Sequence, residues 1–127
     1  MELLTKTQEQ KLIENETNNV DDAKVVVKLF NPEGAGTWFL HKLVKEDDIA
    51  YGLCHIMEPE YGAVSMRELR DYIGRMGLSI ERDRYFPENK YTISEIEAKL
   101  EQGETLWQWS PDTKTLNASE PLHYLMV

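Results

Sequence analysis

The chain has 127 residues, with 14 lysines and arginines against 23 aspartates and glutamates, so its formal net charge at pH 7 is −9. A chain of this length and 41% hydrophobic content has enough apolar material for one domain with one core. The acidic balance argues against general nucleic-acid binding, because neutralised phosphates supply most of that affinity. The single cysteine, Cys54, excludes an intrachain disulfide and any zinc site built from several cysteines.

Membrane insertion and secretion are not indicated. Residues 1–16 are polar and acidic, which is unlike the apolar stretch of a signal peptide. The uncharged run 49–57 is much shorter than the ~20 residues that a membrane-spanning helix needs. We therefore expect a cytoplasmic protein with a single domain over residues 1–127 and no membrane contact.

Two helices are indicated by reciprocal capping pairs. Thr5 with Gln8 predicts a helix that ends near Glu16. Thr92 with Glu95 predicts another that runs through about Leu100 and is closed by a glycine at position 103.

A third helix is predicted over residues 66–76. Ser65 and Glu68 form its capping pair, and Gly77 is suited to the position after its end. Four apolar residues recur at helical spacing and should face the sheet, namely Leu69, Tyr72, Ile73 and Met76.

Strand patterns fill residues 23–64, between the predicted helix that ends near Glu16 and the one that begins at residue 66. The β-branched run in residues 23–30 is too apolar for a one-sided strand and indicates burial on both faces. Turn-forming residues at 31–36, 45–48 and 59–62 separate it from strands at 37–44, 49–57 and 63–64. The prediction is an α+β fold, an antiparallel β-meander of about four strands packed against two or three helices.

The triplet Glu81, Arg82 and Asp83 is the most site-like group in the sequence. A guanidinium between two carboxylates can hold a polar ligand or orient a general base. On a strand, however, Glu81 and Asp83 share one side while Arg82 points to the other. We favour a structural ion-pair role and keep a binding role as the alternative.

All five arginines lie between positions 67 and 84, so Arg67 and Arg70 are candidates for an anion-binding patch. Interleaved acids nearly balance this window, and Asp71 is four residues from both Arg67 and Arg75. A solvated helix face with weak ion pairs is the favoured interpretation.

His41 and His55 fall on neighbouring predicted strands. If position 45 pairs with position 49, His41 opposes Leu53 and lies diagonally from His55 on one face. No third ligand is in reach by spacing, so we expect neither a metal nor a cofactor.

Trp107 and Trp109 alternate along the C-terminal segment and would mark a partner surface if they were exposed. Core packing is the favoured interpretation for both, since large aromatic side chains are usually buried.

A series of blocks in this order and spacing carries a family resemblance: residues 1–5, 26–39, 51–53, 61–62, 65–69 and 77–83, with Phe86. The chain resembles the domain of unknown function 2958 family over about residues 1–90, and residues 91–127 are expected to diverge from it. The resemblance implies small bacterial proteins of plasmids, integrative elements and phages. It transfers no catalytic residue.

Three functions stay open. The first is a non-enzymatic protein-binding or accessory module of a bacterial mobile element, with an acidic surface that contacts a host or element-encoded protein. The second is a small enzyme or ligand-binding protein with a pocket around Glu81, Arg82 and Asp83. The third is an oligomerising scaffold that uses the apolar residues 122–127. The absence of a short catalytic signature favours a non-enzyme.

Overall fold

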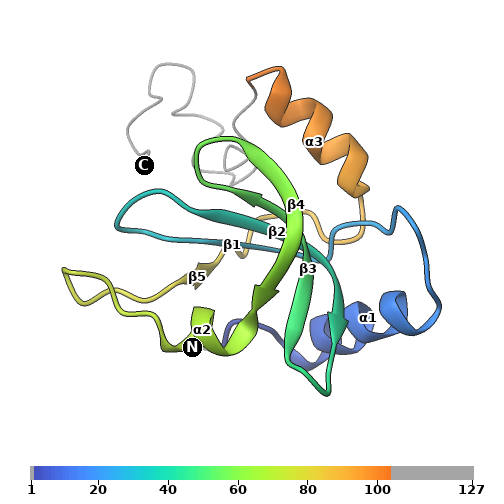
Figure 1. Ribbon diagram of the computed structural model, residues 1–127, viewed down its shortest axis with the longest axis horizontal. Coiled ribbons are helices and arrows are strands. Elements are labelled where there is room, and N and C mark those ends of the chain that lie inside the picture. Colours follow the sequence, from blue (N-terminus) through green and yellow to red (C-terminus); the bar gives the residue numbers. More distant parts are fainter. Residues whose placement is uncertain (1, 104–127) are drawn as a thin grey trace.

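The computed structural model describes residues 2–103, which form a five-stranded antiparallel sheet and three helices (Figure 1). The strand order is β4-β3-β2-β1-β5. The strands are β1 (Val27–Phe30), β2 (Thr37–Val44), β3 (Ile49–His55), β4 (Pro59–Ser65) and β5 (Glu81–Arg82). The helices are α1 (Lys6–Thr17), α2 (Met66–Asp71) and α3 (Ile93–Glu101). The α+β meander is confirmed, with β5 as one strand more than expected.

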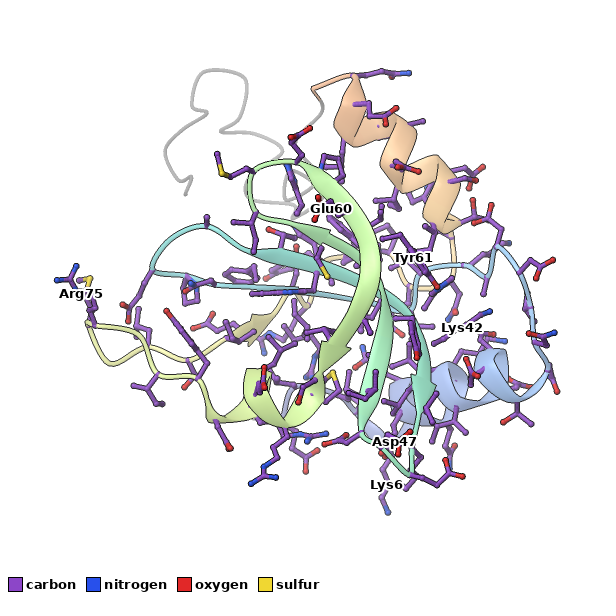
Figure 2. All side chains as sticks on the ribbon, in the orientation of Figure 1. Lys6, Lys42, Asp47, Glu60, Tyr61 and Arg75 are labelled. Atoms are coloured by element: carbon purple, nitrogen blue, oxygen red, sulfur yellow. The ribbon has the colours of Figure 1, made fainter. Side chains whose placement is uncertain are left out.

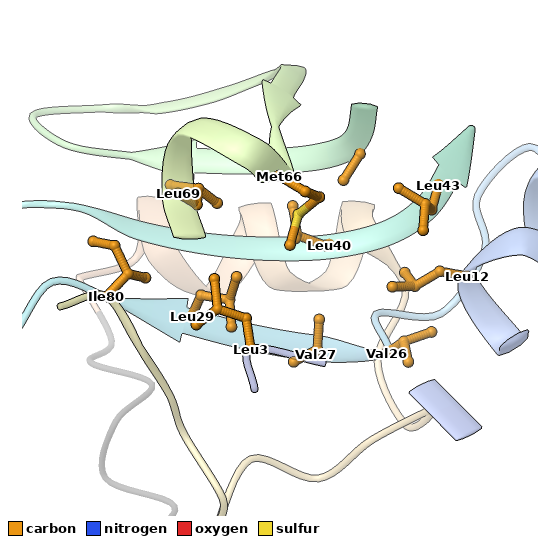
Figure 3. Close-up of a cluster of buried hydrophobic side chains, with 11 residues drawn as sticks. Leu3, Leu12, Val26, Val27, Leu29, Leu40, Leu43, Met66, Leu69 and Ile80 are labelled. Atoms are coloured by element: carbon orange, nitrogen blue, oxygen red, sulfur yellow. The ribbon is translucent and has the colours of Figure 1, made fainter. Parts of the chain in front are cut away.

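Two hydrophobic clusters lie on opposite faces of the sheet. Leu40 belongs to the cluster that includes side chains of α1 and α2 (Figure 3), whereas its neighbour Phe39 belongs to the cluster formed with α3. Neighbouring residues of a strand point to opposite faces, so the helices cover both sides. This explains why β1 is buried on both faces: Val27 and Leu29 belong to the cluster with α1 and α2, and Lys28 lies buried on the opposite face.

The two reciprocal capping pairs form as the sequence predicts. In α1, the Thr5 hydroxyl accepts from the Gln8 backbone N–H and the Gln8 side chain accepts from the Thr5 N–H. Thr92 and Glu95 repeat this arrangement at the start of α3, and Gly103 follows that helix with a φ of 83°. None of the helices within residues 2–103 has the length and apolarity to cross a bilayer.

The prediction of a helix over residues 66–76 is wrong beyond Asp71. Ser65 caps α2 by accepting from the Glu68 N–H, but the backbone turns extended at Tyr72, whose ψ is 130°. Three residues that the helical spacing placed in the core are exposed instead: Tyr72, Ile73 and Met76. The segment turns back on itself, and Ile73 pairs with Ser79 in an antiparallel bridge.

The predicted register of β2 and β3 is also wrong, because Val44 rather than residue 45 pairs with Ile49 and a β-bulge then interrupts the pairing. Leu40 pairs with Gly52 and Lys42 with Tyr51, which leaves His41 as the extra residue. Gly52 is required here, since a Cβ at this position would collide with the backbone carbonyl of Phe39. The turn pairing and the bulge each shift the register by one residue, so Leu53 pairs with Phe39 and not with His41.

Candidate functional site

The triplet Glu81, Arg82 and Asp83 does not converge on one site. The Asp83 carboxylate accepts from the Lys28 ammonium at 3.0 Å, and both side chains are almost fully buried. Arg82 donates to the backbone carbonyl oxygen of Glu2 at 2.6 Å, which ties the N-terminal segment to β5. Glu81 pairs with Phe30 through the strand backbone. The structure therefore gives the three residues separate surroundings.

Burial lowers the pKa of Lys28, and the charge of Asp83 opposes this shift. The Asp83 N–H also donates to the Lys28 carbonyl, so backbone and side chain together hold the short edge strand β5 against β1. Sequence reasoning missed Lys28 because a lysine in a valine-rich strand has no local signal for its partner. The arrangement agrees with the structural ion-pair role favoured for Asp83.

The candidate arginines also lie apart. The Arg70 guanidinium forms two hydrogen bonds with the Asp48 carboxylate, at 2.6 and 3.2 Å, and this pairing raises its pKa. Arg67 is exposed on the same helix, and Arg75 lies beyond the end of α2. Trp107 and Trp109 lie outside the described residues.

His41 is a buried histidine with both ring nitrogens hydrogen-bonded. Its Nδ1 lies 3.1 Å from the Ala23 carbonyl oxygen and its Nε2 lies 2.8 Å from the Tyr61 hydroxyl. A carbonyl only accepts, so Nδ1 carries the proton and Nε2 accepts from Tyr61. Burial lowers the pKa of His41, which favours this neutral ring. Within residues 2–103 no cluster of three or more metal-ligating side chains occurs.

The exposed apolar side chains concentrate on residues 72–79, which we call the finger. Ile73 is 61% exposed and Met76 is 79% exposed, and Tyr72 and Leu78 are exposed beside them. Arg75 is the only charged residue of the finger and lies at its outer end, away from the sheet (Figure 2). Clustered aromatic, methionine and arginine side chains on a projection are typical of protein interfaces.

A carboxylate from another loop fixes the finger. One oxygen of Glu33 accepts from the Met76 N–H at 2.9 Å, and the other accepts from the Leu78 N–H at 2.7 Å. The Glu33 N–H in turn donates to the Asn31 side chain, which orients the loop between β1 and β2. Gly74 makes room for this contact, since a Cβ there would overlap the Glu33 carboxylate. The finger is thus held in one shape while its apolar side chains face solvent.

Sequence reasoning missed both the finger and Glu33. The one available signal was Gly74, which costs about 1 kcal/mol inside a helix. Gly77 has a φ of 86°, so the expected left-handed conformation is present, although it serves the turn of the finger rather than the end of a helix.

Comparison with known proteins identifies the family. Neither a curated protein nor a solved structure matches the chain. The model of the family described as "Protein of unknown function (DUF2958)" matches residues 3–105. The match includes α3 and so continues past residue 90, where the resemblance was expected to end. The chain belongs to the DUF2958 family.

Proposed function

We propose that the chain is a non-enzymatic protein-binding module that contacts its partner through the finger. The observation that carries this proposal is the combination of four exposed apolar side chains with a backbone clamped by Glu33. Preorganisation of this kind lowers the entropy lost on binding. An exposed cluster that the fold holds in place is the expected form of an interface hot spot.

The finger also specifies the chemistry of the partner surface. A convex projection fits a concave apolar pocket, and Met76 and Ile73 are the side chains to fill it. Arg75 is the single charge and calls for a carboxylate at the rim of that pocket. The family resemblance points to bacterial mobile elements, so the partner we expect is a host or element-encoded protein.

The test is affinity capture from a bacterial host lysate with three forms of the chain. Met76→Glu places a charge in the middle of the finger. Met57→Glu is the matched control, because Met57 is 88% exposed but lies between β3 and β4. A partner of the finger is captured by the wild type and by Met57→Glu, whereas Met76→Glu reduces its capture at least about tenfold.

Salt separates this proposal from binding through the acidic surface. Apolar contacts survive about 0.5 M salt, whereas an interface built on the net charge of −9 is screened. Capture that is equal for all three forms and disappears in high salt would refute the finger and support an acidic interface. A change of molar mass with chain concentration in light scattering, abolished by Met76→Glu, would show that the partner is a second copy.

A further inference from the structure

A cavity of about 540 Å³ lies beside the N-terminal segment, α2 and residues 79–80, where the finger ends. Cavities of this size hold small ligands. Its walls come from chain segments that are distant in sequence, and none of the functions considered so far uses it.

The apolar part of the wall consists of aliphatic side chains only. Leu3 and Leu4 come from the N-terminal segment, Leu69 from α2, and Ile80 from the residue before β5. The absence of an aromatic residue from this wall favours a flexible aliphatic body over a flat ring.

The polar part of the wall consists of Lys6, Arg70, Glu2, Glu9 and Ser79, so donors and acceptors are both present. Arg70 donates two of its five N–H groups to the Asp48 carboxylate, and this pairing orients the guanidinium. Three N–H groups remain that can donate to a ligand. Lys6 is exposed and makes no ion pair within the described part of the chain. Of the two acids in the wall, Glu9 already contacts Lys45 at 3.4 Å.

We propose that this cavity binds a small monocarboxylate with an aliphatic body, with Arg70 and Lys6 contacting the carboxylate. The body lies on the leucines and Ile80, where burial of methylene groups supplies the binding energy. Glu2 and Glu9 remain near the head group and repel a second negative charge, so a phosphate dianion binds more weakly than a carboxylate.

The probe is octanoate, titrated to about 10 mM while backbone amide signals are followed by NMR, since a ligand with about ten heavy atoms binds in the millimolar range. We expect saturable shifts at Leu4, Lys6, Leu69 and Ile80. Octylamine and octyl phosphate carry the same chain and should bind at least about fivefold more weakly. Absence of saturable shifts, or equal affinity for octylamine, would overturn the proposal.

Variants assign the head-group contact. Arg70→Gln should weaken octanoate at least about fivefold, and Arg67→Gln on the same helix is the matched control that should leave it unchanged. Asp48→Asn breaks the same ion pair but keeps the guanidinium, so it should bind octanoate as well as or better than the wild type. If Asp48→Asn and Arg70→Gln lose equal affinity, Arg70 acts only through the fold and the proposed contact is wrong.

Discussion

The most direct test of whether the Glu33 carboxylate fixes the finger is to replace Glu33 by glutamine. Glutamine keeps one carbonyl oxygen for one of the two backbone N–H groups and turns an amide NH2 toward the other. A hydrogen bond to a charged acceptor contributes about 1.5–3 kcal/mol. Because the finger is exposed to solvent, we take the low end of this range and expect about 1.5 kcal/mol of local stability to be lost.

Amide hydrogen exchange measures this loss residue by residue. A change of about 1.4 kcal/mol in the free energy of local opening is a tenfold change in exchange rate, so the Met76 and Leu78 amides should exchange about tenfold faster in Glu33→Gln. The global free energy of unfolding should stay within about 0.5 kcal/mol, because the side chains of the finger contribute little to the two cores.

The control is Glu46→Gln, which removes the charge of an exposed acid in the turn between β2 and β3. Its exchange rates in the finger should equal those of the wild type. The reasoning is refuted if Glu33→Gln leaves the Met76 and Leu78 amides unchanged, or if the acceleration spreads evenly over β1 and β2.

Asp83→Asn removes the carboxylate beside the buried Lys28 ammonium and should lower the free energy of unfolding by about 3 kcal/mol in urea titration; an unchanged midpoint would contradict the ion pair. Gly52→Ala forces a Cβ into a backbone carbonyl and should cost about 3 kcal/mol or more, whereas Gly62→Ala at the paired position of β4 meets open space and should change stability by less than about 0.5 kcal/mol; equal midpoints for the two would refute the steric argument. Burial lowers the pKa of His41, so below about pH 6.5 the unfolded chain binds more protons and stability should fall as pH drops from about 7.5 to 5.5. This slope should shrink in His41→Gln, and a wild-type slope in that variant would assign the effect to other groups.

Local signals in the sequence were sufficient for most of the fold. The capping pairs at Thr5 and Thr92 join residues three positions apart, and the side chains of a strand repeat every two residues. Signals of such short range can be read directly from the sequence, as they were for residues 37–44. These elements formed within a residue or two of their expected limits.

The parts that could not be predicted depend on contacts between distant positions. Helical spacing correctly placed Leu69 in the core, but it also placed Ile73 and Met76 there, and both are exposed. The deciding contact comes from Glu33, which is 43 residues away from Met76 in the chain. The bulge at His41 is equally hidden, because it depends on the pairing with β3; the extra residue puts Leu40 and Leu43, three residues apart, into the same hydrophobic cluster.

The candidate site shows the same division. The role of Asp83 in an ion pair was predicted, yet its partner Lys28 lies 55 residues away and was not. The position of Arg70 on α2 was predicted, whereas its pairing with Asp48 in the turn between β2 and β3 was not, because helical spacing suggests acids on the same helix instead.

The energetic balance of the finger supports the proposal that this segment serves binding rather than stability. Covering Ile73 and Met76 would stabilise the fold by about 1.5–3 kcal/mol for each fully buried side chain. Both side chains are exposed to solvent, and the Glu33 carboxylate holds the backbone of the finger in this arrangement. Gly74 adds to the cost, because it loses more conformational entropy on folding than any other residue would. A segment that lowers stability in several ways and is still held in one shape is the pattern expected where function opposes stability, and among residues 2–103 the finger fits this pattern.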